Sequence, residues 1–369
     1  MRQTRPAVLL IALLLAAVIP WTSPAPASAA LPAEVPARST VPGIRHVFVI
    51  NLENKGFGTT FGPSSKAPYL SRTLRQRGAL LSQYYGTAHH SLPNYIAQIS
   101  GQAPNPQTQG DCPVYTRFTG TGTGSVAPGQ AVGHGCVYPT RVRTVADQLA
   151  AKHLSWRGYM EDMGRGCRHP ALGSRDTTQK ARKGDQYAAR HNPFVYFASV
   201  TSKASCAGRD VSLSHLAKDL QSVRTTRNLS YISPNLCNDG HDAPCVDGRP
   251  GGLVSANRWL KRWVPRILDS PAFRRDGLLV VTFDEAESGD ASACCGNQVG
   301  PNSARPGITG PGGGRVGAVL VSRFITPGST STRPYNHYSL LRTVEDAFGL
   351  GHLGYAQTAR SFGSDVFGG

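Results

Sequence analysis

Two long apolar runs that end in acidic residues constrain this chain most. They read IRHVFVINLEN, over residues 44–54, and GLLVVTFDEAE, over residues 277–287. A continuous apolar run with polar residues at its end is typical of a parallel strand that is buried on both faces. We therefore expect two such strands. Glu53 and Asn54 follow the first, and Asp284 and Glu285 end the second.

The rest of the chain alternates between strand and helix patterns. We expect helices in residues 66–86, 213–223, 256–268 and 336–350, a helix followed by a strand within residues 142–161, and strands in residues 193–200, 228–235 and 315–322. Strands that alternate with helices predict an α/β fold with a mostly parallel sheet covered by helices on both faces.

The first residues have the pattern of a secretory signal. Arg2 and Arg5 precede an apolar run over residues 7–19, and small residues follow as far as residue 29. The run is shorter than the roughly 20 residues that a membrane span requires. We predict a signal peptide over residues 1–29, a single domain with loop insertions over residues 30–369, a secreted protein and no integral membrane segment.

The eight cysteines are even in number, which favours disulfides in an oxidising compartment. Bonds between Cys112 and Cys136 and between Cys237 and Cys245 would close local loops. The adjacent Cys294 and Cys295 are not expected to bond to each other, because such a bond would be strained. The spacings do not resemble a zinc finger, so we expect no thiolate metal site.

The net charge of +17 predicts attraction to anions such as phosphorylated molecules, acidic polymers or anionic lipid head groups. The basic residues are scattered, so a bias in overall composition explains the charge equally well. No basic helix or aromatic platform indicates binding to nucleic acid, and we expect none.

The polar residues after the strands suggest a metal site. The carboxyl ends of parallel strands meet at one edge of a sheet, where ligands bind. Oxygen ligands from two neighbouring strands suit a divalent cation. The alternative for each acid alone is a helix cap or a loop salt bridge. SPNLCNDGHD adds Asp239 and His241, and His337 begins a predicted helix, although either histidine has a surface or capping role as its alternative. We assign His191 a structural hydrogen bond.

The stretch HHSLPNYIAQISG places Ser91 just ahead of a predicted helix, with Pro93 in its first turn. A hydroxyl at this point lies near free backbone donors and the positive end of the helix dipole, which is a phosphate-binding geometry. A cation held by nearby acids would lower the pKa of the hydroxyl and make it a nucleophile. The alternative is that Ser91 only caps the helix.

Five segments together resemble the bacterial phosphoesterase family of acid phosphatases and phospholipases C, within the alkaline phosphatase-like superfamily. They are HVFVINLENKGFGTTFG, HHSLPNYIAQISG, SPNLCNDGHD, TFDEAE and NHYSLLRTVEDAFGL. The resemblance runs from about residue 44 to residue 350. It implies an α/β/α sandwich with a divalent metal ion, one or two in number, near a serine nucleophile.

The resemblance also implies roles for individual residues. Ser91 matches the nucleophile, and the metal-binding pairs of the family match two pairs here, Glu53 with Asn54 and Asp284 with Glu285. Asp239, His241 and His337 match positions that bind a second metal or the leaving group. We add Asn94 and Lys55 as candidate phosphate contacts.

The chain departs from the family at two points. Gly56 stands where relatives commonly have Ser, which affects substrate contacts. The late pair is Asp-Glu where two-zinc members have Asp-His, which favours oxygen ligation and a single metal.

We therefore predict hydrolysis of phosphate monoesters or phospholipid-type diesters through a phosphoserine, with His241 or His337 as the acid. The sequence leaves the metal, the preferred ester and the oligomeric state open. A serine carboxylesterase of α/β-hydrolase type is disfavoured, because Gly-x-Ser-x-Gly is absent. A non-catalytic binder of anionic cell-surface polymers is the other alternative, and it requires the acidic pairs to be accidental.

Overall fold

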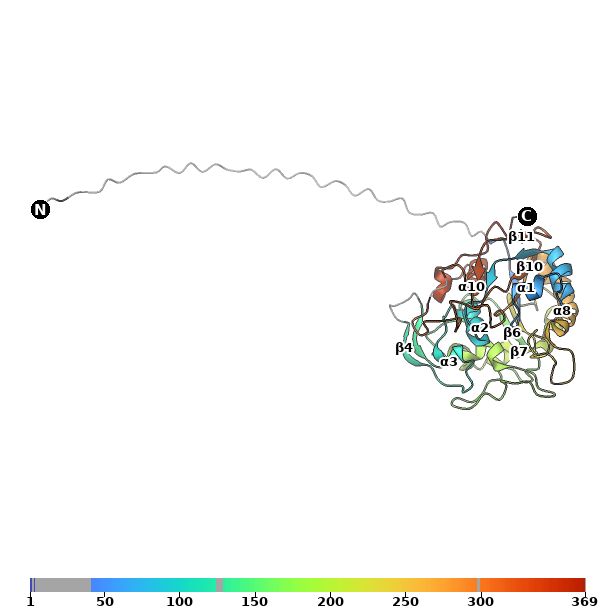
Figure 1. Ribbon diagram of the computed structural model, residues 1–369, viewed down its shortest axis with the longest axis horizontal. Helices are drawn as coiled ribbons and strands as arrows, with labels where there is room; N and C mark the ends of the chain where they lie inside the picture. The colour runs from blue at the N-terminus through green and yellow to red at the C-terminus, as the bar shows by residue number, and fades with distance from the viewer. Residues whose placement is uncertain (2, 4–40, 124–128, 297–298, 369) are drawn as a thin grey trace. The chain divides into compact units, whose positions relative to one another are not determined.

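An eight-stranded sheet organises the chain (Figure 1), in the order β11-β2-β10-β9-β1-β8-β6-β7. The computed structural model describes residues 1, 3, 41–123, 129–296 and 299–368. Apart from residues 1 and 3, the predicted signal peptide lies outside the described residues. The strands of the sheet are β1 (His46–Leu52), β2 (Ala79–Leu81), β6 (Trp156–Met160), β7 (Asp210–Ser212), β8 (Leu229–Ser233), β9 (Gly277–Phe283), β10 (Ala318–Ser322) and β11 (Thr330–Ser331).

The centre of the sheet is parallel. All seven residues of β1 pair in parallel register with the seven of β9 on one side, and β8 pairs with β1 on the other. β6 and β7 continue the parallel order, whereas β10 runs antiparallel to β9. Every residue of β1 and β9 is buried, as their continuous apolar runs predict. The predicted mostly parallel α/β sheet is therefore confirmed.

Helices lie on both sides of this sheet. Figure 1 shows the labelled strands β6, β7 and β10 between α2 and α10 on one side and α8 on the other. The helices are α1 (Phe57–Phe61), α2 (Ser91–Ser100), α3 (Pro106–Gln109), α4 (Val145–Ala151), α5 (Ala198–Thr201), α6 (Cys206–Arg209), α7 (Leu216–Asp219), α8 (Gly252–Leu268), α9 (Pro271–Asp276) and α10 (His337–Phe348). The fold is thus an α/β sandwich.

Short turns and hairpins complete the structure. One π turn and five 3₁₀ turns are present in the described chain: η1 (Tyr69–Leu74), η2 (Arg75–Arg77), η3 (Ala189–His191), η4 (Pro193–Tyr196), η5 (Leu213–His215) and η6 (Gly354–Gln357). Two small sheets pair β3 (Tyr84–Tyr85) with β12 (Tyr335–Asn336) and β4 (Thr119–Thr123) with β5 (Ala131–His134).

The segment 193–200, expected as a strand, forms η4 and α5 instead. Its aromatic residues are buried by stacking: Phe194 packs on Trp156 with ring centroids 4.6 Å apart, and Phe197 on Tyr138 at 5.1 Å. The β-forming composition therefore reflects burial in the core and not pairing in the sheet. In the segment 66–86, only residues 69–77 are helical, and β2 and β3 follow.

Four disulfides bond all eight cysteines. The expected loops are closed by Cys112–Cys136, around β4 and β5, and by Cys237–Cys245. The expectation for the adjacent pair is wrong, because Cys294 bonds to Cys295. The backbone of Cys295 adopts the left-handed conformation, with φ of 63°, and this turn in the chain accompanies the bond. The fourth bond joins Cys167 to Cys206.

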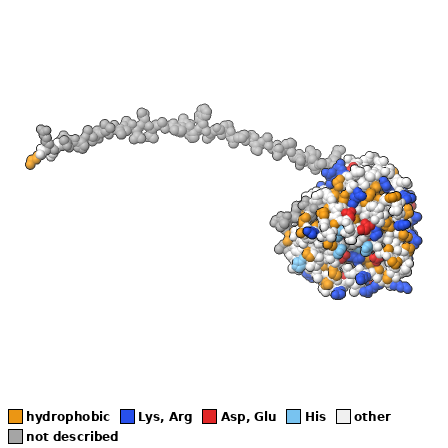
Figure 2. All heavy atoms as spheres, viewed as in Figure 1, with side chains coloured by type: hydrophobic (Ala, Val, Ile, Leu, Met, Phe, Trp, Pro, Cys, Tyr) orange, Lys and Arg blue, Asp and Glu red, His pale blue; other side chains and the backbone are white. Residues whose placement is uncertain are grey.

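Within the described chain, no helix combines the length and the apolar character that crossing a membrane requires. Lys and Arg side chains are spread across the face of the molecule in view and do not gather in one patch (Figure 2). This view agrees with the scattered distribution of the basic residues in the sequence.

Candidate active site

The hydroxyl of Ser91 lies against a carboxylate at the end of the central strand. Ser91 is the first residue of α2 and is buried, and its Oγ donates a hydrogen bond of 2.7 Å to Oε2 of Glu53. The preceding residue, His90, is extended, and Pro93 stands in the first turn, where its missing N–H costs no helical hydrogen bond. The start of α2 therefore presents the serine directly to the carboxyl edge of the sheet.

Asn94 holds the loop that leads into α2. Its Oδ1 accepts hydrogen bonds from the backbone amides of Thr87 and Ala88, at 2.8 and 3.0 Å. Its Nδ2 donates to the carbonyls of Ala88 and His90, at 2.7 and 2.9 Å. Both amide hydrogens are thus engaged within the protein. This geometry does not favour the expected phosphate contact by Asn94, because both of its amide hydrogens already have acceptors within the protein.

The polar residues after three neighbouring strands meet beside Ser91. β1 lies between β8 and β9 in the sheet, so Glu53, Asp239 and Asp284 are delivered to the same edge. The amide of Glu53 donates to the carbonyl of Asp239 at 2.9 Å, and the amide of Asn54 donates to Oδ1 of Asp284 at 3.0 Å. Asn54 takes the left-handed conformation, with φ of 53°, at this junction.

The three carboxyl groups are buried together without a balancing cation among the described side chains that bond to them. Burial, followed by repulsion from Asp284 and Asp239, raises the pKa of Glu53 well above its usual value. Burial is also the main cause that raises the pKa of Asp239, and it raises the pKa of Asp284 to about 7. Such a concentration of buried negative charge calls for a positive group.

A divalent cation fits this donor set. Three buried oxygens have no hydrogen-bond partner: Oδ1 of Asn54, Oδ2 of Asp239 and Oδ2 of Asp284. Carboxylate and amide oxygens are the ligands that hard divalent cations prefer. The residues that the sequence nominates for a metal thus supply free oxygens where a cation would neutralise the carboxylates.

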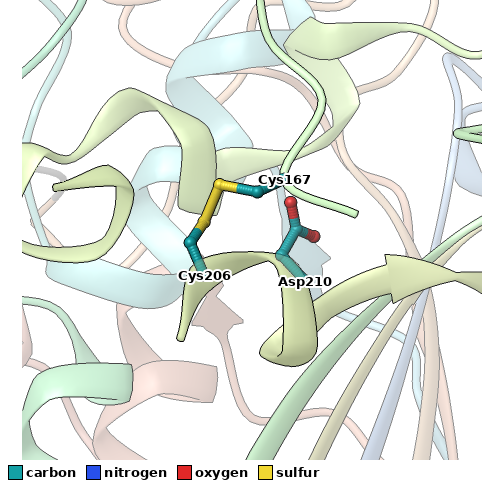
Figure 3. A group of neighbouring side chains, drawn as sticks. All are labelled: Cys167, Cys206 and Asp210. Carbon is teal, nitrogen blue, oxygen red and sulfur yellow. A yellow bond between two sulfur atoms is a disulfide. The ribbon is translucent and has the colours of Figure 1, made fainter. Parts of the chain in front are cut away.

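Two tighter groups of side chains are not metal sites. Within the described residues, the groups of three or more His, Cys, Asp or Glu with ligand atoms all within 4.8 Å are Cys167, Cys206 and Asp210 (Figure 3), and Cys237, Cys245 and Asp247. In each group both sulfurs form a disulfide, so neither offers a thiolate. The predicted acids form no group this tight.

Glu285 contacts His89 and not the other acidic residues of the site. Its buried carboxylate contacts Nδ1 of His89, whose Nε2 lies 3.1 Å from the carbonyl of Asp290. His89 is two residues ahead of Ser91. Glu285, nominated as a metal ligand, therefore lies against the loop that carries the serine.

His241 and His337, the two histidines predicted as proton donors to the leaving group, lie in different surroundings. His241 is 46% exposed, with Nδ1 at 3.3 Å from Oδ1 of Asp242, and its backbone amide donates to Asp239 at 2.9 Å. His337 is fully buried, and burial lowers its pKa to about 4. Its Nε2 lies 2.5 Å from the carbonyl of Asp284, and its Nδ1 lies 3.1 Å from the hydroxyl of Tyr84.

These contacts do not favour the expected role of His337 as the acid. Both ring nitrogens are engaged within the core, and the lowered pKa disfavours the protonated ring. His337 therefore supports the backbone of Asp284 and is poorly suited to give a proton to a leaving group. His241 remains the nominated histidine with access to solvent.

His191 belongs to the site, although the sequence interpretation assigned it a structural hydrogen bond. Its Nε2 lies 3.3 Å from Oε2 of Glu53 and its Nδ1 lies 3.7 Å from Oδ2 of Asp239, yet neither nitrogen forms a hydrogen bond. The ring stacks on Tyr95 at 5.3 Å, and the hydroxyl of Tyr95 donates to Oε1 of Glu53. Burial is the main cause that lowers the pKa of His191, so the neutral imidazole is favoured as a ligand or acceptor.

A guanidinium also lies near the serine. Arg190 is mostly buried, and its Nε lies 3.7 Å from Oδ2 of Asp111. Oδ1 of Asp111 accepts a 2.9 Å hydrogen bond from the amide of Leu92, in the first turn of α2. The carboxylates of Asp111, Glu53 and Asp239 oppose the effect of burial and raise the pKa of Arg190. The sequence interpretation missed Arg190 and Asp111, whose signal was their position next to His191 and Cys112.

Lys55 lies at the edge of the site. It is half-buried and its Nζ donates a 3.0 Å hydrogen bond to the carbonyl of Asn54. The contact leaves the ammonium other hydrogens to donate, so Lys55 is the nominated phosphate contact that the geometry still allows.

The fold and these residues define a class: α/β sandwich proteins that place a helix-start serine against carboxylates at the carboxyl edge of the sheet. Within it, the chain belongs to the Phosphoesterase family, whose model matches residues 63–351. The match contains Ser91, Asp239 and Asp284 and begins after Glu53.

Two curated relatives have similar sequences. A phosphate-repressible acid phosphatase of Penicillium chrysogenum is 28% identical over 325 residues, which are 86% of this chain and 62% of that protein. A phosphatidylinositol-3-phosphatase of Mycobacterium tuberculosis is 26% identical over 332 residues, which are 90% of this chain and 86% of that protein. This chain thus spans less than two thirds of the Penicillium relative.

A solved structure described as a protein in the alkaline phosphatase superfamily, from Vibrio parahaemolyticus, is 13% identical. The comparison covers 88% of this chain and 70% of the other, with a TM-score of 0.48.

Proposed function

We propose that this protein is a secreted, metal-dependent phosphoesterase that hydrolyses phosphate monoesters or phospholipid-type diesters, in the manner of an acid phosphatase or a phospholipase C. The observation that carries the proposal is the 2.7 Å hydrogen bond from the Ser91 hydroxyl to Glu53, inside a cluster of buried carboxylates. The names of the two relatives, an acid phosphatase and a phosphatidylinositol phosphatase, support the same reaction class.

Asn54, Asp239 and Asp284 would hold the divalent cation, with Glu53 or His191 as further ligands. When bound, the cation supplies positive charge that offsets the carboxylates and lowers the pKa of a nearby hydroxyl. Glu285 is a more distant candidate, because its carboxylate contacts His89.

In the first step, Ser91 Oγ attacks phosphorus and its proton passes to Oε2 of Glu53, which already accepts that hydrogen bond. The bond from phosphorus to the alcohol oxygen breaks, and His241 protonates the leaving alcohol. Arg190 and Lys55 donate to the phosphoryl oxygens, whose charge is spread in the transition state. In the second step, water attacks phosphorus and gives a proton to His241, while the bond from phosphorus to Ser91 Oγ breaks and Glu53 returns its proton to Oγ. The product is phosphate from a monoester, or a phosphomonoester from a diester.

The proposal is tested with a panel of a phosphomonoester, a phosphodiester and phosphatidylcholine, each assayed with several divalent ions and after chelation. Ser91→Ala should fold and release no product, whereas Ser100→Ala, on the same helix, should turn over normally. Ser100 is a matched control, because its hydroxyl bonds only within α2 and the turn that follows. Turnover by Ser91→Ala at the normal rate would refute the nucleophile.

The four disulfides and the predicted signal peptide support secretion. Expression of the full chain with a C-terminal tag tests it: the protein should appear in the medium with residues 1–29 removed.

A further inference from the structure

A hollow of about 430 Å³ lies at the amino ends of β6 and β8, and three arginines line it: Arg157, Arg209 and Arg227. We call it the arginine hollow. β8 is parallel to β1, so these strand ends lie at the edge of the sheet opposite the candidate active site. A five-residue strand spans roughly 16 Å, which separates the two places.

Arg157 and Arg227 share a single carboxylate, that of Asp219. Arg157 Nη1 contacts Oδ2 of Asp219, and the hydroxyl of Tyr159 donates to the same oxygen at 2.7 Å. Arg227 Nε lies 4.0 Å from that oxygen and is buried without a hydrogen-bond acceptor. The side chains of Arg157 and Arg227 are only 17% and 29% exposed, so positive charge is left without compensation below the surface.

The third arginine is held in place beside them. Arg157 donates through Nε and Nη2 to the carbonyl of Gly208, at 3.1 and 3.0 Å, and this fixes the residue before Arg209. Gly208 and Arg209 belong to α6, and a disulfide joins Cys206 of this helix to Cys167 (Figure 3). Arg209 forms no ion pair with a described residue. Hydrogen bonds and a disulfide thus hold the backbone around the arginine hollow in place.

We propose that the arginine hollow binds a phosphate group, as a second anion site separate from the candidate active site. Guanidinium groups match phosphate oxygens in planar, two-point hydrogen bonds. Arg227 Nε and the guanidinium of Arg209 supply the hydrogen-bond donors. The phosphate would balance the positive charge of the arginines that the single carboxylate of Asp219 does not neutralise. The phosphate belongs either to a soluble compound or to an anionic lipid.

The first test is calorimetric titration of the full chain with inorganic pyrophosphate, in the Ser91→Ala background to prevent turnover. Arg209→Gln/Arg227→Gln should remove one pyrophosphate site, with at least a tenfold loss of affinity there. The matched control, Arg77→Gln/Arg360→Gln, removes the same charge from two exposed arginines elsewhere and should keep that site. Thermal unfolding should show that both variants fold.

The second test separates the two sources of phosphate. Vesicles of phosphatidylcholine with phosphatidylglycerol are sedimented with each variant. Loss of both vesicle and pyrophosphate binding in Arg209→Gln/Arg227→Gln identifies a lipid phosphate, and loss of pyrophosphate binding alone identifies a soluble compound. If that variant binds both probes as tightly as the control, or if the unaltered arginine hollow binds neither, the proposal is wrong.

Discussion

The backbone amide of Asn54 donates a 3.0 Å hydrogen bond to Oδ1 of Asp284, and this bond joins the ends of β1 and β9. The two residues are 230 positions apart in the chain. The bond leaves Oδ2 of Asp284 and Oδ1 of Asn54 buried and without partners. The strand pairing itself therefore creates the oxygen-rich position that we assign to a cation.

We predict that His191→Ala lowers kcat by about 100-fold, because the imidazole lies between Glu53 and Asp239 and is the candidate nitrogen ligand of the cation. The loss should be partly offset by excess divalent ion if the ring is a ligand. Steady-state kinetics across a series of metal concentrations measures both effects. His215→Ala changes an exposed histidine and is the control. Equal kcat in the two variants would rule out a role for His191.

Arg190→Gln should weaken binding of phosphate as a competitive inhibitor by about 10-fold to 100-fold, because a charged hydrogen bond contributes about 1.5–3 kcal/mol. Arg190→Lys should restore part of this affinity, since the charge returns without the planar fork. Inhibition constants for inorganic phosphate provide the measurement, with Arg165→Gln as an exposed control. Unchanged inhibition in Arg190→Gln would place the guanidinium outside the phosphate site.

The stability of the protein should fall as pH rises, in part because of Glu345 on α10. Burial is the main cause that raises the pKa of Glu345 from 4.5 to about 9. The folded state thus holds a proton that the unfolded chain releases above pH 4.5, so this stabilisation is complete below that pH and is lost as pH rises toward 9.

Glu345→Gln keeps an uncharged side chain at every pH and removes this dependence. The difference in unfolding free energy between Glu345→Gln and the unaltered protein should shift in favour of the variant by about 1 kcal/mol or more between pH 5 and pH 8. Urea denaturation at the two pH values measures the shift. Asp269→Asn, at an exposed aspartate, should show none. Parallel pH profiles for Glu345→Gln and the unaltered protein would contradict the assignment.

The disulfide between Cys112 and Cys136 should matter more for stability than the one between Cys237 and Cys245. The first spans 24 residues and the second spans 8. Loop-closure entropy favours the longer loop by about 1 kcal/mol. Replacing both cysteines of each pair with serine and comparing the unfolding free energies measures the difference. A larger loss from the shorter loop would show that contacts outweigh chain entropy here.

The sequence predicted the sheet and the meeting of its acidic strand ends because both follow from local pattern. Two apolar runs define β1 and β9, and parallel strands bring Glu53 and Asp284 to one edge without further information. The helix-start position of Ser91 follows in the same way from Pro93 and the apolar run behind it.

The rest depends on contacts between distant segments. His191 and Arg190 lie in the 3₁₀ turn η3, which gives no periodic signal, and they reach the site by long-range packing. Asn94 was named as a candidate phosphate contact because its hydrogen bonds to the preceding loop cannot be seen in the sequence. The surroundings of His337 could not be predicted for a related reason: its burial and its contact with the carbonyl of Asp284 depend on how α10 packs.

The most direct test of the central claim is mass spectrometry of the protein, quenched in acid during turnover of a phosphomonoester. We predict one phosphoryl group on the peptide that contains Ser91, and none in Ser91→Ala, which should also lose turnover. If the unaltered protein turns over without a phosphorylated Ser91, and Ser91→Ala releases phosphate equally fast, then the serine beside Glu53 is not the nucleophile.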